Sequence, residues 1–326
     1  MKRIVFFNGH QNGDVANSRG VVHYITDRLK DQYEYYFLTL RTELGQKGAV
    51  KFDDNIIIHN PIVQGLLPFM PPMWNPDIKT AHERGETYFL YGDTLFLNVW
   101  IGSSPYFMQN RAIHGGGITR ESLCKQTCEL IDIIHEAGGP LIEYPSELDT
   151  LAQRTANPDN KALVDTLANK LSTFRKVVLI CNGPVMSSQS DQFNFGEILT
   201  GLMSQYSDVA FVYTDSNFQN NLDNCFFVND HVPLPNLSEI DYLSKWCDVI
   251  VSRMSGPGII TMNKDNYLDS NKTLISFTVN PHIAFEALSS DNEINNRSWN
   301  SPSGARMVWT NNHTPQSIIQ TIESNI

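Results

Sequence analysis

The sequence begins with KRIVFFN at residues 2–8, continues with GHQNGD at residues 9–14, and then enters a longer segment that reaches Leu29. The first stretch is apolar and rich in strand formers, and the segment from Val15 to Leu29 has the pattern of a helix. A buried strand that opens through glycine into a helix places backbone N–H groups and acidic side chains at the carboxyl end of a sheet. Open α/β folds bind their ligands there, so this stretch predicts an α/β fold with Asp14 at a ligand-binding edge.

Length, composition and charge restrict the classes of protein to which the chain can belong. It has 326 residues, 41% of them hydrophobic, which suits two domains of ordinary size or one large domain. The formal net charge is −11 and no basic cluster is present, which argues against a nucleic-acid-binding protein. No apolar stretch approaches the roughly 18–20 residues that span a bilayer, and the start lacks a secretory cleavage site. We therefore expect a cytoplasmic protein without a transmembrane segment; peripheral association with the inner face of a membrane stays open.

The five cysteines predict neither a disulfide framework nor a metal site. Their number is odd and the chain is long, which favours reduced thiols. Cys124 and Cys128 share one face of an expected helix, but no further ligands with suitable spacing stand nearby. We therefore expect no metal site at the cysteines. For the chain as a whole we expect no metal ion and no cofactor.

Strands and helices alternate along the chain, and the alternation restarts near Lys176. We expect strands at residues 2–7, 33–40, 55–59, 93–102, 176–181, 209–213, 225–228, 248–252 and 273–278. We expect helices at residues 15–29, 119–137, 162–174, 195–206, 238–246 and 315–324. Such alternation predicts two Rossmann-like domains whose parallel sheets, covered by helices, face a central cleft. The expected domains are residues 1–170 and 171–310, and residues 311–326 form a C-terminal helix that packs back on the first domain.

The turn at Gly13 and Asp14 is the first candidate for chemistry. Glycine lets the backbone approach a ligand closely, and the helix dipole favours an ionised aspartate in the first turn. Such an aspartate suits a general base, and an ordinary helix N-cap is the alternative. Gly9 and Gly13 do not form the G-x-G-x-x-G fingerprint of dinucleotide-binding proteins, which argues against an oxidoreductase.

The stretch SRMSGPG at residues 252–258 follows an expected strand and is the second candidate. Its small residues leave room for a phosphate, whose oxygens the free amides, the Ser255 hydroxyl and the Arg253 guanidinium would bind. The pattern differs from a P-loop, and a plain strand-to-helix turn is the alternative. We expect Arg253, Ser255, Gly256 and Pro257 to bind an anionic ligand.

The stretch NGPVMSSQ at residues 182–189 follows the first strand of the second half and is the third candidate. Its amide and hydroxyl side chains are neutral donors and acceptors of the kind that bind sugars and nucleotides. A solvated loop is the alternative. We take Asn182, Gly183, Ser188 and Gln189 as candidate ligand-binding residues. Together, the three candidates place an acid in one half and a diphosphate-binding region in the other, as a sugar nucleotide requires.

At three places the sequence resembles the heptosyltransferase-like inverting glycosyltransferases, which are similar to glycosyltransferase family nine. Residues 2–15, through Gly13 and Asp14, resemble the family's opening strand and Gly-Asp turn. Residues 176–189 occupy the place of its first donor-domain strand and loop, and residues 238–252 resemble the helix and strand before its phosphate loop. This sequence has Met254, Ser255, Gly256 and Pro257 where the family shows Asp-Thr-Gly.

The resemblance implies a GT-B fold and an activity. By it, Asp14 is the catalytic base of a metal-independent hexosyl- or heptosyltransferase-like enzyme that uses a nucleotide diphosphate sugar as its donor substrate. Glu239 joins the donor-binding residues by the same resemblance. The acceptor is a glycan or glycolipid, which we expect to contact Asn12, Gly13, His114 in a loop, and Trp74 through its ring.

Two other readings stay open. A non-hydrolysing sugar-nucleotide epimerase shares this architecture and would turn over the donor without an acceptor. A non-catalytic glycan- or nucleotide-binding protein can use the same scaffold, because a fold does not fix a function.

Overall fold

The fold is described from a computed structural model of the chain. The description covers residues 1–10, 12–39, 52, 55–71, 86–114, 120–183, 190–233, 236–253, 256–278, 297–300 and 304–326. The chain divides into two compact units, Met1–Ala152 and Gln153–Ile326, and each is described by itself.

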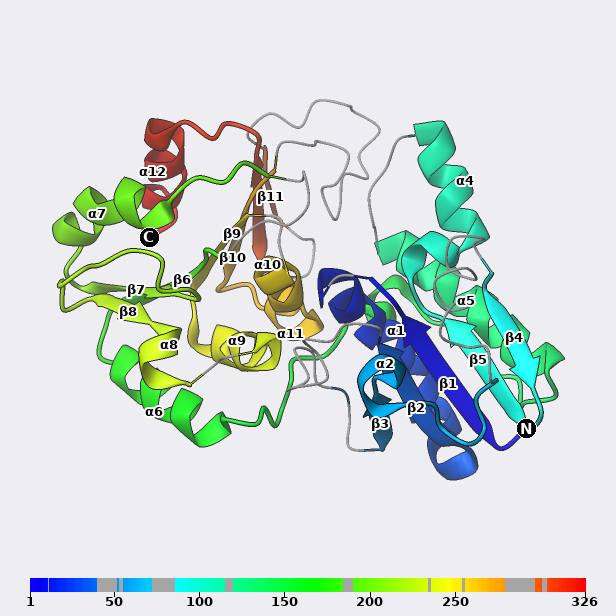
Figure 1. The fold of residues 1–326 in the computed structure, drawn as a ribbon. Helices are drawn as coiled ribbons and strands as arrows, with labels where there is room; N and C mark the ends of the chain where they lie inside the picture. The colour runs from blue at the N-terminus through cyan, green and yellow to red at the C-terminus, as the bar shows by residue number, and fades with distance from the viewer. Residues whose placement is uncertain are drawn as a thin grey trace. The chain divides into compact units, whose positions relative to one another are not determined.

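The first unit is built on a five-stranded sheet. Its order is β3 (Ile56–His59), β2 (Glu34–Thr39), β1 (Arg3–Asn8), β5 (Thr94–Asn98) and β4 (Tyr88–Tyr91), as Figure 1 shows. Strands β1, β2, β3 and β5 are parallel, whereas β4 runs antiparallel to β5 through a turn in which Gly92 has a φ of 59°. The central strand β1 is apolar because both faces of the sheet are covered.

Helices connect and cover these strands. They are α1 (Asn12–Leu29), α2 (Pro61–Gln64), α4 (Pro105–His114) and α5 (Arg120–Glu136), with short 3₁₀ turns η1 (Lys30–Gln32), η3 (Ile101–Ser103) and η4 (Glu147–Thr150). Helix α1 packs against α5 and η4. At this contact Gly20 lies directly against the backbone of Thr150, and a Cβ at position 20 would stand 1.9 Å from the Thr150 carbonyl oxygen.

The second unit has a seven-stranded sheet. Its order is β11 (Arg297–Asn300), β12 (Arg306–Thr310), β10 (Thr273–Phe277), β9 (Val249–Arg253), β6 (Lys176–Cys181), β7 (Val209–Tyr213) and β8 (Cys225–Phe227). Only the pair β11–β12 is antiparallel among these strands. The strand order reverses between β6 and β9, and such a switch point is where open α/β sheets bind ligands.

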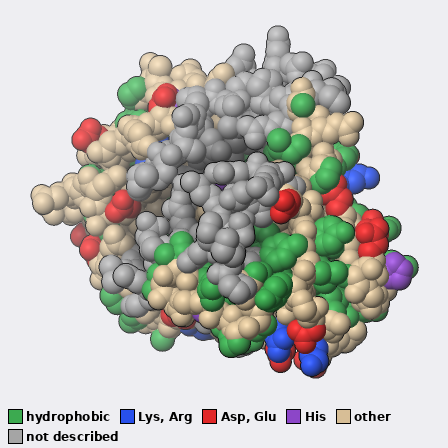
Figure 2. Space-filling model, turned by 45° about the vertical axis from the view of Figure 1, so that its right-hand side comes forward, with side chains coloured by type: hydrophobic (Ala, Val, Ile, Leu, Met, Phe, Trp, Pro, Cys, Tyr) green, Lys and Arg blue, Asp and Glu red, His purple; other side chains and the backbone are tan. Residues whose placement is uncertain are grey.

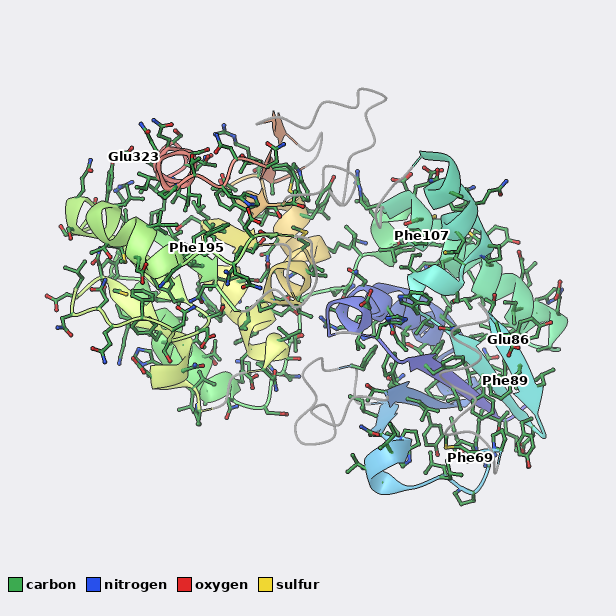
Figure 3. All side chains as sticks on the ribbon, turned by 45° about the horizontal axis from the view of Figure 1, so that its top comes forward. Phe69, Glu86, Phe89, Phe107, Phe195 and Glu323 are labelled. Atoms are coloured by element: carbon green, nitrogen blue, oxygen red, sulfur yellow. The ribbon has the colours of Figure 1, made fainter. Side chains whose placement is uncertain are left out.

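Helices cover both faces of this second sheet. They are α6 (Lys161–Leu171), α7 (Phe195–Gln205), α8 (Val228–His231), α9 (Leu237–Leu243) with η5 (Ser244–Trp246), α10 (Gly256–Thr261), α11 (Lys264–Leu268) and α12 (Pro315–Glu323). Figure 1 shows α7 and α12 on one face and α6, α8 and α9 on the other. Phe195, labelled in Figure 3, is buried in the core between α7 and the sheet. Glu323, labelled on α12, accepts a hydrogen bond of 3.0 Å from the Tyr206 hydroxyl beside α7.

Most expected elements are present, but two expectations about organisation differ from the structure. The boundary between the units falls after Ala152 rather than after residue 170, because α6 packs on α9 of the second unit. The C-terminal helix, expected on the first domain, packs instead on α7. Its apolar residues Ile318 and Ile322 are fully buried in the core of the second unit.

The helices, the surface and the cysteines can be compared with the expected class of protein. Within the described residues, no helix combines the length and apolarity that a bilayer crossing requires. On the face drawn in Figure 2, hydrophobic side chains of the described residues gather at the lower right, with acidic and basic side chains beside them. All five cysteines are free, as expected, and Cys181 and Cys247 are buried.

Candidate functional site

Two neighbouring strands of the first unit end in buried asparagines that shape the turns beyond them. Asn8 ends β1, and its Oδ1 accepts a hydrogen bond of 3.0 Å from the His10 amide. Asn98 ends β5, and its Oδ1 accepts one of 3.1 Å from the Trp100 amide. Because β1 and β5 are parallel neighbours, both turns form at the same edge of the sheet. The carboxyl edge is therefore built by a repeated Asx turn.

These turns bring two rings together. The imidazole of His10 stacks on the indole of Trp100 with 4.0 Å between ring centroids and 17° between ring planes. The Trp100 carbonyl oxygen also accepts a hydrogen bond from Gln126 of α5. Sequence reasoning did not single out His10. The signal that could have found it is the asparagine two residues earlier, which is repeated before Trp100.

Asp14 lies at this same edge, in the first turn of α1. The helix begins at Asn12, so Asp14 stands inside the first turn rather than before it, and its side chain is partly exposed. Its backbone carbonyl accepts a hydrogen bond of 3.1 Å from the Asn8 side chain. Gly13 is buried beside it. An aspartate in a first helical turn is favoured in its ionised form by the helix dipole, as a general base requires.

The carboxyl edge of the second unit is organised by Arg253 at the end of β9. Its side chain is only 3% exposed. Nη2 donates to the carbonyl oxygens of Asn182 and Gly183, the latter at 2.7 Å, and Nη1 donates to the Phe193 carbonyl at 2.9 Å. Burial lowers the pKa of the guanidinium, which still stays charged. Nη1 also donates to Oε1 of Gln192 at 3.4 Å, so each of the four terminal N–H groups has an acceptor among the described residues. In this geometry Arg253 holds the backbone at Asn182 and Gly183 and does not offer a terminal N–H to a phosphate.

Asn182 is fixed from the neighbouring strand. Its Nδ2 donates to the Asp215 carbonyl at 2.7 Å and to Asn217 at 3.0 Å, and its Oδ1 accepts from the Asp215 amide at 2.8 Å. The side chain therefore ties the loop after β6 to the loop after β7. What this leaves for a ligand is the backbone around Gly183. A Cβ at position 183 would lie 3.5 Å from Cγ of Pro257.

The segment around Gly256 and Pro257 begins α10 and meets that loop. Gly258 is required by packing, because a Cβ there would lie 2.6 Å from the Cβ of Ser252. The described parts of the second and third candidate stretches meet at the switch point between β6 and β9, where Gly183 lies beside Pro257 and accepts a hydrogen bond from Arg253.

Glu239 lies in α9 and is fully buried. Its Oε1 accepts from the Asn160 backbone and side chain at 3.1 and 3.0 Å, and its Oε2 accepts from the Asn236 amide at 2.9 Å. Asn236 is the N-cap of this helix, and Asn236 and Glu239 form a capping box. These bonds give Glu239 a structural role in the helix.

Several other expected site residues lie partly or wholly outside the described part of the chain. Trp74, Ser188, Gln189 and Ser255 lie outside the described residues, as do the side chains of Asn12 and His114. The sequence placed His114 in a loop, but its backbone is the last residue of α4. Among the described residues, no group of three His, Cys, Asp or Glu side chains gathers as metal ligands.

The fold is shared with solved structures. The sequence matches no protein-family profile and no curated protein. The structure is similar to a glycosyl transferase family 9 protein from Veillonella parvula DSM 2008, with a TM-score of 0.51 and 10% identity over 100% of this chain and 90% of that one. E. coli heptosyltransferase WaaC with ADP-2-deoxy-2-fluoro heptose gives a TM-score of 0.47 and 10% identity over 99% and 100%. For the Neisseria meningitidis UDP-GlcNAc 2-epimerase bound to UDP-GlcNAc the TM-score is 0.39, with 10% identity over 85% of this chain and 82% of that one. The first similarity confirms the α/β, GT-B fold expected from the sequence.

Proposed function

We propose that this protein is an inverting glycosyltransferase. It moves a sugar from a nucleotide diphosphate sugar to a hydroxyl of a glycan or glycolipid in the cytoplasm. The observation that carries the proposal is the fold shared with a glycosyltransferase family 9 protein over the whole chain. Because a fold alone does not fix a function, the polar groups at the two sheet edges supply the rest of the argument.

The donor is assigned to the second unit. The switch point between β6 and β9 carries the backbone of Gly183, held by Arg253, beside Gly256 and Pro257 at the start of α10. Small residues at such a point let a diphosphate approach the main chain. Arg253 acts here by shaping the loop, not by touching the phosphate.

The acceptor and the base are assigned to the first unit. The carboxylate of Asp14 takes the proton of the acceptor hydroxyl while the oxygen of that hydroxyl attacks the anomeric carbon of the donor sugar. The new C–O bond forms as the bond to the diphosphate breaks on the opposite face, which inverts the anomeric configuration. Gly13 lets the acceptor approach the turn closely, and the stacked rings of His10 and Trp100 stand at the same edge.

The leaving diphosphate gains negative charge during this step. We propose that backbone amides at the switch point stabilise it without a metal ion. Addition of EDTA is then expected to leave transfer unchanged. Loss of activity in EDTA that Mn²⁺ restores would contradict this part of the proposal.

The experiment that tests the function begins with ligands. Thermal shifts with ADP, UDP and GDP and with their sugar conjugates identify a donor, because a bound ligand raises apparent stability. Asp14→Asn is then expected to lower transfer by about 10²- to 10⁴-fold, the range for a lost general base, while donor binding is kept. Asp31→Asn, an exposed acid in η1, serves as the matched control. Near-normal transfer by Asp14→Asn excludes the base, and donor turnover without an acceptor indicates an epimerase.

A further inference from the structure

A histidine–aspartate pair lies at the carboxyl edge of the second sheet, apart from the residues discussed so far. His313 follows β12, and its Nδ1 lies 2.7 Å from Oδ2 of Asp191, which belongs to the segment between β6 and α7. The pair thus joins the chain after the first strand of this unit to the chain that enters α12. Nothing in the sequence patterns pointed to it, because its two residues stand 122 positions apart.

The imidazole of this pair is held rigidly. The His313 side chain is 8% exposed, and its ring lies 5.4 Å from the Phe193 ring and 6.2 Å from the Phe277 ring. Its Nε2 is buried without a hydrogen-bond partner among the described residues. The histidine is therefore fixed by packing, and it in turn fixes the carboxylate that it contacts.

The carboxylate itself faces outward. Asp191 is 67% exposed, and only its Oδ2 is engaged by His313. Together with Asn311, Asn312 and Thr314, the pair lines an open hollow of about 570 Å³. Oδ1 of Asp191 is thus a fixed acceptor at the wall of a hollow rather than a freely rotating surface group.

The chemistry of the lining selects a class of ligand. Carboxylate, amide and hydroxyl groups line the hollow, and no lysine or arginine is among its described lining residues. A phosphate would meet the Asp191 carboxylate there, with no lysine or arginine among the described lining residues to attract it. Neutral hydroxyl groups fit, because they donate to the carboxylate in charge-assisted hydrogen bonds and exchange further bonds with amide side chains.

The hollow is connected to the proposed donor edge by one residue. The Phe193 ring lies beside His313, while the Phe193 carbonyl accepts a hydrogen bond of 2.9 Å from Arg253. Arg253 in turn holds the loop at Gly183. Since β9 and β12 are parallel members of one sheet, their ends lie at the same edge.

We propose that the Asp191–His313 pair recognises hydroxyl groups of the donor's sugar and so determines which sugar the protein accepts. This inference rests on the proposed function. Asp191 is the group that touches the sugar, and His313 is a positioning residue that orients it.

The test compares nucleotide diphosphates with their sugar conjugates by calorimetry. The probes are ADP, UDP and GDP, each beside ADP-glucose, UDP-glucose or GDP-mannose. Asp191→Ala and His313→Gln are expected to weaken binding of the preferred conjugate about tenfold or more, as loss of one charge-assisted hydrogen bond does, and to leave the plain diphosphate unchanged. Asp208→Ala, which removes an exposed carboxylate paired with Arg175 in the same unit, is the control and is expected to change neither.

Each other outcome overturns the inference. Equal weakening of conjugate and diphosphate, or none, shows that the pair does not bind the sugar. Should Asp191→Ala fail to fold, Asp191→Asn is measured in the same way. If the wild-type protein binds none of the probes, the proposed function is wrong. If the wild type binds them but the variants do not weaken the conjugate selectively, only this subsite is wrong.

Discussion

The side-chain amide of Asn8 donates a hydrogen bond of 3.1 Å to the backbone carbonyl oxygen of Asp14. The same side chain accepts from the His10 amide, so one buried residue holds both ends of the turn between β1 and α1. The position of the proposed base therefore depends on a residue that does not itself take part in proton transfer.

Asn8→Ala is expected to lower both stability and transfer. It leaves the His10 amide and the Asp14 carbonyl without this partner, which costs about 1–3 kcal/mol of the free energy of unfolding. Asn98→Ala removes the equivalent turn on β5 without touching Asp14, so it is the matched control. Chemical denaturation and single-turnover assays should show similar stability losses but a larger drop in transfer for Asn8→Ala. Equal transfer by both variants would argue against a role for Asn8 in placing Asp14.

Arg253→Lys tests the assignment of Arg253 as a residue that shapes the loop. Lysine keeps the charge but cannot reproduce the fork that reaches Asn182, Gly183 and Phe193. We expect the free energy of unfolding to fall by more than about 2 kcal/mol and nucleotide binding to weaken with it.

Arg175→Lys is the control for this substitution. Arg175 pairs with Asp208 at 2.7 Å on an exposed surface, where such a pair contributes about 0–1 kcal/mol. Urea denaturation of both variants measures the contrast. An Arg253→Lys protein as stable as wild type that has lost nucleotide binding would instead assign Arg253 to direct phosphate contact.

The sequence allowed the central strands to be predicted, because their signal is local. Residues 176–181 and 209–213 are buried apolar runs that end at turn residues, and β6 and β7 occupy the same positions. Thr314 and Pro315 mark the start of α12 correctly, since the Thr314 side chain accepts from the Ser317 amide. Where the hydrophobic period and the capping residue agree, the element forms as expected.

Edge strands and long-range contacts were missed for a physical reason. Strand β4 has mostly exposed residues, so Tyr88–Tyr91 shows no buried apolar run, and only its pairing with β5 makes it a strand. Strand β12 is not an edge strand, because it lies between β10 and β11; it is as long as β7 and mostly buried, and it was missed all the same. The contacts of Arg253 and Glu239 could not be predicted either, because a sequence pattern shows neither which carbonyls surround a guanidinium nor which amides surround a carboxylate.

Gly20→Ala is expected to disrupt the first unit. A Cβ at position 20 would lie 1.9 Å from the Thr150 carbonyl oxygen and 2.7 Å from the Ala152 amide nitrogen, and backbone atoms cannot rotate away. Overpacking of this kind costs about 1–3 kcal/mol or more. Gly201→Ala in α7 meets nothing within 4 Å and should instead stabilise the protein by up to about 1 kcal/mol through helix propensity. Thermal denaturation of the two variants should shift in opposite directions; a neutral Gly20→Ala would contradict the close packing of α1 on η4.

His23 of α1 predicts how stability depends on pH. Burial, aided by the nearby Arg19 charge, lowers the pKa of His23 from 6.5 to about 4. As the pH falls below 6.5, the unfolded chain takes up a proton that the folded protein does not bind. The contribution of His23 to the free energy of unfolding is therefore complete above pH 6.5 and decreases as the pH falls from 6.5 to about 4. The loss between pH 7 and pH 5 is about 2 kcal/mol, since one pKa unit corresponds to about 1.4 kcal/mol.

His23→Phe keeps a ring against Phe52, which the imidazole meets edge-on at 5.9 Å, and removes the titration. The free energy of unfolding, measured in urea at pH 8, 7, 6 and 5, should therefore fall less steeply for the variant than for the wild type, with pH 8 isolating any packing change. Parallel curves for the two proteins would show that His23 is protonated alike in the folded and unfolded states.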